Sequence, residues 1–199
     1  YTYTIMSFGI WFVWYNFDLY AYGGAWEGVK LAGQEMQENK QKDVLEAIAL
    51  IRDGDRVVTG FACGEPFGIE DAMVEHYEQF HDVTIVNMLT MGDSPWIRTE
   101  MKGHFRLNCM FASASNRQAV SSGIAAFTTC PFDEIPEMPR VYTRPRVGVV
   151  RLTPPAYHGY RTSVTTAEYI YALREHVAVR ICQITKALTR RVPNVHTPL

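Results

Sequence analysis

Three short loops of this chain combine residue types that can bind ligands with glycines or prolines that fix the backbone. They read "ACGEPFG" from 62, "TMGDSPW" from 90 and "TPPAYHGY" from 153, and each follows an apolar run of strand length. In open parallel sheets, ligands bind in the loops beyond the carboxyl ends of the strands. We therefore expect loops 62–67, 90–96 and 153–160 to lie at one edge of a sheet and to line one cleft.

The first loop joins a strand to a helix. Gly64 and Pro66 flank Glu65, and a glycine there lets the backbone approach a ligand closely. Free amides at the start of the following helix could hold an anion, although Glu70 and Asp71 weaken such a site. A purely structural turn is the alternative, because glycine-rich turns are common between strands and helices.

The third loop contains two prolines near its start, and they end the strand before it. Pro154 and Pro155 lack the amide hydrogen that a sheet ladder needs, so they stop the pairing. One interpretation is a rigid loop that turns His158 and Tyr160 toward the cleft, with Gly159 allowing the turn. The other is a surface histidine beside a tyrosine that covers the core.

Two further groups of residues could take part in chemistry. In "HFRLN", alternation puts His104 and Arg106 on one strand face, either as a buried polar pair near the site or as exposed residues of an edge strand. Cys63 could be a hydrolase nucleophile with His104 or His158 as its base. A buried structural cysteine is the competing interpretation, because no neighbour in the sequence is basic enough to lower the pKa of its thiol.

The elements that must position these residues alternate between strands and helices. Strands are predicted at 56–61, 83–89 and 147–152, and helices at 41–52 and 69–79. Further strands are predicted within 104–111, 125–130 and 177–184, and helical segments within 115–123, 131–138 and 167–176. The strands are continuous apolar runs, as in parallel sheets buried on both faces. The pattern predicts an α/β fold with an open, mostly parallel sheet flanked by helices.

Composition fits a soluble globular protein, with 47% hydrophobic and 20% charged residues. The net charge of −2 argues against a general nucleic-acid binder. Residues 1–139 carry 9 basic and 19 acidic side chains, whereas residues 140–199 carry 10 and 2. This basic third is either neutralised within the folded surface or faces an anionic ligand or an acidic partner.

The four cysteines and the first residues bear on location. Cys63, Cys109, Cys130 and Cys182 show no metal-ligand spacing and fit reduced thiols of an intracellular protein. Residues 1–36 form an aromatic-rich extension of unknown role, whose apolar run is too short to span a membrane and which lacks signal-peptide features. Residues 37–199 are expected to form the domain.

An ordered series of motifs resembles a known family. "IRDGDRVVTGFACGEP", "NMLTMG", "EMKGHFRLNCMF", "NRQAV", "EIP" and "PPAYHGY" follow one another with the spacing of the N-terminal domain of the acetyl-CoA hydrolase/transferase family. This family includes acetate, butyrate and 4-hydroxybutyrate CoA-transferases. The resemblance runs from about Leu45 onward and rests on the series, since no single motif is specific.

The resemblance implies a CoA-transferase that moves CoA between an acyl-CoA and a small carboxylate through a glutamyl-CoA thioester. The family's glutamate nucleophile lies in its C-terminal domain, so we expect no catalytic residue in this chain. We also expect that domain as a partner, in cis or in trans. Glu65 could substitute for that nucleophile, but this is the weaker interpretation. The stronger interpretation is that Glu65 lies near the pocket at the start of a helix. Acyl-CoA would be a substrate, with no permanently bound cofactor and no metal. A cytoplasmic location (mitochondrial in a eukaryote) and a possible homo-oligomer are expected, without nucleic-acid or membrane partners.

The resemblance also implies which residues bind substrate or CoA. They are Gly64, Glu65, Pro66, His104, Arg106, Asn116, His158, Gly159 and Tyr160. One departure concerns Ser113, Ala114 and Ser115, which stand where family members usually have Gly-Gly-Asn, so that side chains enter a place where the backbone is expected close to the ligand. This change leaves a second possibility, a non-catalytic half that binds CoA or a partner.

Overall fold

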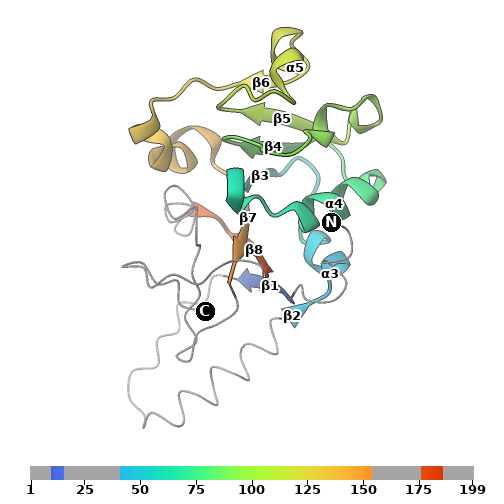
Figure 1. Ribbon diagram of the computed structural model, residues 1–199. Helices are drawn as coiled ribbons and strands as arrows, with labels where there is room; N and C mark the ends of the chain where they lie inside the picture. The colour runs from blue at the N-terminus through green and yellow to red at the C-terminus, as the bar shows by residue number, and fades with distance from the viewer. Residues whose placement is uncertain (1–9, 16–40, 154–175, 186–199) are drawn as a thin grey trace.

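A parallel sheet forms the centre of the molecule. The computed structural model describes residues 10–15, 41–153 and 176–185. Within these residues, eight strands form one sheet in the order β2-β1-β8-β7-β3-β4-β5-β6 (Figure 1). The strands from β8 across to β6 are all parallel, whereas β1 runs antiparallel to both β8 and β2. The predicted open, mostly parallel sheet of an α/β fold is confirmed.

The elements follow one another along the chain with these bounds. The strands are β1 (Ile10–Tyr15), β2 (Gln41–Lys42), β3 (Arg56–Thr59), β4 (Val83–Asn87), β5 (Phe105–Cys109), β6 (Ala126–Phe127), β7 (Val147–Leu152) and β8 (Val179–Ile184). The α-helices are α3 (Val44–Ile48), α4 (Phe67–Glu75) and α5 (Arg117–Ser121). Short 3-10 helices are η1 (Ala62–Gly64), η2 (Tyr77–Gln79), η3 (Pro95–Ile97), η4 (Thr99–Met101) and η5 (Phe132–Glu137), and η6 (Pro139–Thr143) is a π-helix.

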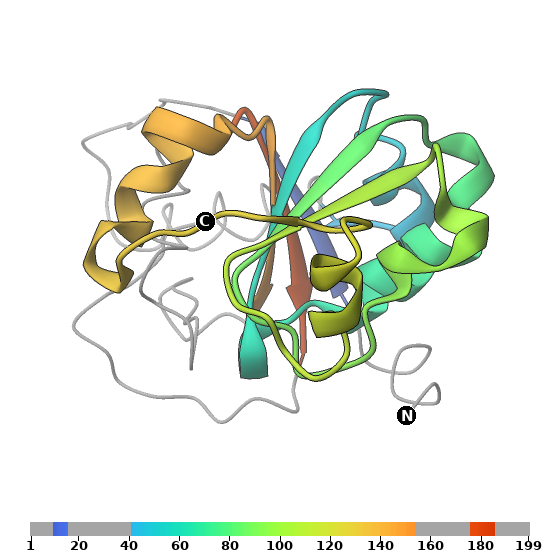
Figure 2. The ribbon, with the colours of Figure 1, turned by 90° about the horizontal axis from the view of Figure 1, so that it is seen from above.

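The two faces of the sheet are covered differently. α3, α4 and α5 lie on one side of the strands, and η5 and η6 lie on the other (Figure 2). The larger core cluster lies on the first side and includes Ile48, Ile69 and Met73 from the helices. On the other side, Ile135 of η5 packs with a smaller cluster that includes Val58 and Val86. Both faces of β3 and β4 are therefore buried, which explains their continuous apolar sequences.

Several elements are shorter than the sequence predicts. The helix predicted at 41–52 spans Val44–Ile48, because Asp43 caps it with a 2.6 Å hydrogen bond from the Leu45 amide to its carboxylate and the chain then turns toward Gly54. The helix predicted at 69–79 is α4 followed by η2. The strand predicted at 125–130 is reduced to the two exposed residues of β6. Most of the helix predicted at 167–176 lies outside the described residues.

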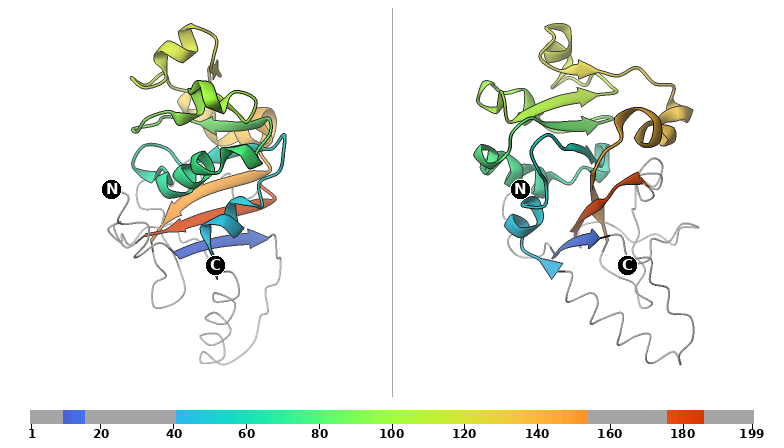
Figure 3. Two further views of the ribbon diagram at one scale, coloured as in Figure 1. Left: turned by 90° about the vertical axis from the view of Figure 1, so that its right-hand side faces the viewer. Right: turned by 180° about the vertical axis from the view of Figure 1, so that it is seen from behind.

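The aromatic N-terminal segment contributes to the sheet. Ile10–Tyr15 forms β1, whose Ile10 is opposite Ile184 and whose Tyr15 is opposite Val179. Figure 3 shows β1 alongside β8 and β7. β1 thus covers one side of β8 with backbone hydrogen bonds, and β2 forms the edge of the sheet beyond it.

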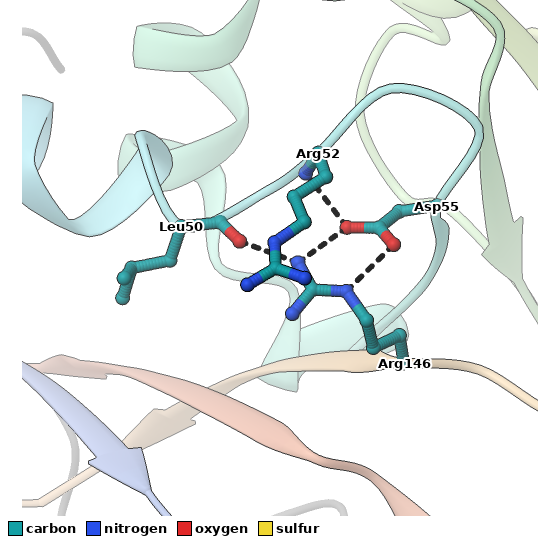
Figure 4. Close-up of polar contacts among 4 residues, drawn as sticks. All are labelled: Leu50, Arg52, Asp55 and Arg146. Carbon is teal, nitrogen blue, oxygen red and sulfur yellow. Dashed lines mark hydrogen bonds and ion pairs between the residues drawn. The ribbon is translucent and has the colours of Figure 1, made fainter.

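An arginine at the start of β7 fastens the amino end of the sheet. Arg146 donates from Nε to Asp55 Oδ1 (2.7 Å) and from Nη2 to Asp55 Oδ2 (2.6 Å) and to the Leu50 carbonyl (2.5 Å). The Arg52 amide donates to the same carboxylate, as Figure 4 shows. This bidentate pair joins the turn before β3 to the start of β7, at the end of the sheet opposite the predicted ligand side.

Candidate functional site

A buried polar cluster lies where β3 and β4 end. Thr59 is the last residue of β3 and Asn87 the last of β4, and Glu65 and Glu70 follow β3 in the chain. All four are buried, with Glu65 1% and Glu70 5% exposed. Buried carboxylates are rare in proteins, so this cluster is the candidate functional site.

Glu65 connects the loop after β3 to the loop after β4. Its Oε2 accepts a 3.0 Å hydrogen bond from the Met91 amide, and the Thr90 hydroxyl and Gly92 amide are further partners of the carboxylate. Asn87 Nδ2 lies 3.4 Å from Glu65 Oε1. The Glu65 carboxylate therefore accepts hydrogen bonds from within the fold. This agrees better with the interpretation of Glu65 as a structural residue near a pocket than with its interpretation as a nucleophile.

Asn87 extends the cluster to β3. Its Nδ2 donates to Thr59 Oγ1 at 2.8 Å and to the Gly60 carbonyl at 3.3 Å. Thr59 is in turn a hydrogen-bond partner of Glu70. A connected set of polar side chains thus runs from α4 across two strand ends to loop 90–92.

The backbone brings these residues together through a sharp turn. Ala62 adopts a positive φ of 50°, and η1 reverses the chain immediately after β3. The Ala62 amide donates to the Leu89 carbonyl at 2.9 Å, which holds the two loops side by side. At Gly92 a Cβ atom would lie 2.9 Å from Phe67 Cε1, so a larger residue there would displace the partly exposed Phe67 ring.

The two carboxyl groups differ in proton affinity. Burial raises the pKa of Glu65, and hydrogen bonds from its neighbours oppose that shift. Burial, and then the negative charge of Glu65, raise the pKa of Glu70 well above its usual value. Among the described residues neither carboxylate has an ion pair, and Glu70 Oε1 has no hydrogen-bond partner. Glu65 therefore holds the negative charge more readily than Glu70, whose neutral form burial favours, and this arrangement can hold or release a proton near a ligand.

Two of the three predicted loops meet. Loops 62–67 and 90–96 lie together, as the contacts from Glu65 to Met91 and from Ala62 to Leu89 show, and this part of the prediction is confirmed. The parallel pairing of β3 with β7 brings the end of β7 to the same edge. Of loop 153–160, Thr153 is described, whereas His158, Gly159 and Tyr160 lie outside the described residues.

His104 and Arg106 lie at the other end of the sheet, so the predicted buried polar pair is wrong. β5 begins at Phe105, which puts both residues at its amino end. His104 Nδ1 donates to the Phe80 carbonyl at 2.7 Å, and its ring meets Tyr77 edge to face. Arg106 is 71% exposed and pairs with Asp82 at 2.6 Å. Strand alternation fixes a shared face but not which end of the sheet the residues occupy.

A third loop joins the site through serines. Ser94 Oγ lies 3.2 Å from Ser115 Oγ, which lies 3.0 Å from Ser113 Oγ. The serines at the departure from the family pattern therefore tie the loop after β5 to loop 90–96. Asn116, predicted to bind substrate, follows them and is 1% exposed, with an Oδ1 that has no partner among the described residues.

Cys63 is exposed on η1, beside the site, so the interpretation of Cys63 as a buried structural cysteine is wrong. His104 cannot act as its base, because that histidine lies at the amino end of β5. The cation whose charge interacts with Cys63 is Arg151, near the end of β7. His158, the second base considered, lies outside the described residues. The hydrolase hypothesis thus loses one of its two bases.

Several residues of the cluster were not predicted. Thr59 and Asn87 end apolar strands, and Glu70 was considered only as an acid that would weaken anion binding. A polar residue at the last inward position of a buried strand is the signal that could have identified the first two. Across the described ranges, no group of three potential metal ligands occurs. Nor does that part of the chain contain a helix long and apolar enough to cross a membrane.

Solved structures with this fold include CoA-transferases. A 4-hydroxybutyrate CoA-transferase from Porphyromonas gingivalis matches with a TM-score of 0.59 and 26% identity, over 72% of this chain and 33% of that one. RipA from Yersinia pestis matches with a TM-score of 0.65 over 73% and 36%, but at 16% identity it shows the fold alone. The fold and its polar carboxyl edge define an α/β domain of the architecture found in CoA-transferases.

The sequence comparison identifies the family. Residues 30–197 match the acetyl-CoA hydrolase/transferase N-terminal domain, and the chain belongs to this family. It is 28% identical over 158 residues to 4-hydroxybutyrate coenzyme A transferase of Clostridium kluyveri, covering 79% of this chain and 37% of the relative. It is 24% identical over 173 residues to succinyl-CoA:cyclohexane-1-carboxylate CoA transferase of Geobacter metallireducens, covering 85% and 39%. The chain thus spans less than two fifths of either relative.

Proposed function

We propose that this chain is the N-terminal half of a CoA-transferase of the 4-hydroxybutyrate or butyrate–acetate type. Such an enzyme moves CoA between an acyl-CoA and a small carboxylate. The observation that supports this most strongly is the link from Glu65 to Met91, because it joins "ACGEP" and "NMLTMG", two motifs of the family resemblance, at one edge of the sheet. In parallel sheets that edge is where ligands bind.

The half described here forms one wall of the acyl-CoA site. Gly64 and Pro66 set the path of the loop after β3, and Glu65 holds the next loop against it. Asn116 is proposed to contact substrate or CoA. The loop that carries His158, Gly159 and Tyr160 is proposed to do the same at the interface with a C-terminal domain. Acyl-CoA is a substrate in this proposal rather than a permanently bound cofactor, and the protein acts in the cytoplasm.

The reaction requires a carboxylate nucleophile from the C-terminal domain, supplied in cis or in trans. A glutamate there would attack the thioester and carry CoA as a covalent intermediate, which divides one difficult exchange into two easier ones. The residues matching the family here belong to its N-terminal domain. Binding contacts alone cannot replace a covalent nucleophile, because they stabilise ground state and transition state about equally. The 199-residue chain by itself is therefore proposed to be inactive.

The test is to mix this chain with the C-terminal domain of a family member and follow acyl-CoA exchange with acetate. Exchange that appears in the mixture and is absent from either part supports the proposal. Turnover by the isolated chain contradicts it. A control mixture whose C-terminal domain carries Gln for its nucleophilic glutamate must be inactive.

A non-catalytic half that binds CoA or a partner is the second candidate. It is favoured by Ser113, Ala114 and Ser115, because their side chains occupy a segment where the family usually has two glycines. A stable complex with the C-terminal domain that binds CoA but does not exchange acyl groups would select this candidate. Restored exchange after changing Ser113 and Ala114 to glycine would identify the serine segment as the cause.

A further inference from the structure

The last inward positions of four neighbouring strands form a polar row. Asn87 of β4 bonds to Thr59 of β3, and Thr59 is paired in register with Val149 of β7. Arg151 lies two residues beyond Val149 and therefore on the same face, and it is paired with Gln183 of β8. We name Asn87, Thr59, Arg151 and Gln183 the polar row. Val149 lies two positions before Arg151, and Ile181 lies two positions before Gln183. Both belong to the core on the side of α4.

The two halves of the polar row differ in how well their hydrogen bonds are satisfied. Thr59 and Asn87 bond to each other and contact Glu70 and Glu65. Arg151 Nε and Gln183 Oε1, by contrast, are buried atoms that have no hydrogen-bond partner in the described part of the chain. Neighbouring strands lie about 4.8 Å apart, so one small group can reach both side chains.

Within the ranges that the structure describes, Arg151 is a cation without a carboxylate partner. Arg106, Arg140 and Arg146 each pair with an acid. Arg151 is half-buried, burial lowers the pKa of its guanidinium, and the sole opposing influence is Cys63. Among the described residues it forms no ion pair, and neither Glu65 nor Glu70 owes any part of its pKa shift to it. A charge removed from water without a partner is costly, which is characteristic of a site that a ligand completes.

We propose that Arg151 and Gln183 form a subsite for a carboxylate, which takes the distal carboxylate of a dicarboxylic acyl group. The guanidinium presents two parallel N–H groups that match a carboxylate, and the Gln183 amide can turn its NH2 group to the same oxygen atoms. The position near the carboxyl ends of β7 and β8 lies on the ligand side of the sheet. The assignment of the ligand as an acyl group rests on the proposed function, whereas the carboxylate-binding property does not.

A phosphate of CoA is the other oxyanion that the subsite could meet. A phosphate dianion needs more positive charge than one half-buried guanidinium supplies, and Glu65 lies at the same edge of the sheet and repels it. A carboxylate carries a single charge and fits one arginine. The experiment therefore compares ligands that carry the two groups separately.

The first measurement uses free succinate and the full chain, with butyramide as an uncharged probe. The Arg151 Nε–H resonance and the Gln183 side-chain amide are followed by NMR at constant ionic strength. Succinate is expected to shift both with a dissociation constant of roughly millimolar, and butyramide to leave them unchanged. Arg151→Gln is expected to weaken succinate binding at least about tenfold, while Arg52→Gln, which removes an exposed arginine at the amino end of the sheet, keeps it. Equal binding by Arg151→Gln and the wild type overturns the proposal.

Thermal unfolding separates binding from a structural role. Because the charge is unpaired, Arg151→Gln is expected to keep or raise the Tm without ligand, and to lose the increase in Tm that succinate gives the wild type. Arg151→Lys keeps the charge but loses the two parallel donors, so it should bind succinate with intermediate affinity. A large loss of Tm in both variants would identify Arg151 as a structural residue and overturn the proposal.

The second measurement compares CoA, butyryl-CoA and succinyl-CoA. The proposal expects Arg151→Gln to weaken succinyl-CoA alone. Equal weakening of all three overturns the carboxylate assignment in favour of phosphate. If none of the three binds while succinate still depends on Arg151, the subsite stands and the proposed function fails. If all three bind and Arg151→Gln changes none, the subsite fails and the proposed function stands.

Discussion

Glu65 and Glu70 are five residues apart and are held in opposite ways. Hydrogen bonds surround the carboxylate of Glu65, whereas Glu70 Oε1 has none among the described residues and its neighbour adds negative charge. In a buried place the first arrangement favours the charged form and the second the neutral form. The second negative charge of the pair, on Glu70, is therefore the more costly one to form.

Changing Glu70 to Gln is expected to raise stability at alkaline pH. The folded state raises the pKa of Glu70 well above 4.5, so its stabilising effect is complete below pH 4.5 and is lost as pH rises through the folded pKa. Each pH unit in that window costs about 1.4 kcal/mol. Urea unfolding from pH 5 to 9 should show wild-type stability falling relative to Glu70→Gln. Parallel stability curves for the two proteins would contradict a neutral Glu70.

Changing Glu65 to Gln is expected to loosen loop 90–92. Gln keeps one oxygen acceptor, so its NH2 group must face a donor, either the Met91 amide or the Asn87 side-chain amide, at a cost of about 1–3 kcal/mol. Hydrogen exchange should become faster at the Met91 and Gly92 amides before it does in β4. Glu75→Gln, at the exposed last residue of α4, is the matched control. Unchanged exchange at Met91 would show that this hydrogen bond contributes nothing to the loop.

At the scale of elements, the two ends of the sheet have separate roles. The amino end is fastened by the bidentate pair of Asp55 with Arg146, whose hydrogen bonds also involve the Leu50 carbonyl and the Arg52 amide. The carboxyl end holds the polar cluster and unpaired groups. Because the ion pair stabilises the amino end of the sheet, the strand ends on the ligand side can carry polar groups that contribute little to the stability of the fold.

Changing Asp55 to Asn is expected to destabilise the fold by about 2–4 kcal/mol. The change leaves the guanidinium of Arg146, whose side chain is 25% exposed, without its charge partner. Chemical denaturation measures the loss. Asp93→Asn removes an exposed acid with little expected effect and serves as the control. A loss as small as that of Asp93→Asn would mean that the pair contributes no net stability.

At the scale of the whole molecule, burial is greatest in the middle of the sheet. β3, β4 and β7 lie between other strands and are covered on both faces, whereas β6 has two exposed residues at the edge. The molecule should therefore open from the β6 edge inward.

Native-state hydrogen exchange should follow this order. The amides of Val58, Ile85 and Val149 are expected to exchange only through global unfolding, and that of Thr128, which donates to the Cys109 carbonyl next to β6, through local opening. Adding denaturant should speed exchange of the first group most steeply. Protection of Thr128 equal to that of Ile85 would show that the β6 edge does not open before the centre of the sheet.

The sequence alone determined the fold class and the family. "RVVT", "VTIVN" and "VGVVRL" are strands of a parallel sheet, and their short length and their β-branched apolar residues are typical of strands that are buried on both faces. It also indicated the ligand side, because loops 62–67 and 90–96 follow such strands. The proposed binding role of the predicted site residues stays a prediction.

The tertiary structure decided which distant residues meet. Glu65 contacts Met91, and Arg151 lies in register with Gln183, through strand order and pairing that no local pattern encodes. It also decided that His104 and Arg106 lie at the amino end, since the start of β5 at Phe105 determines which edge they occupy. Local sequence sets the periodicity of each strand, whereas packing between strands sets their order and register, and the chemistry of the site depends on the latter.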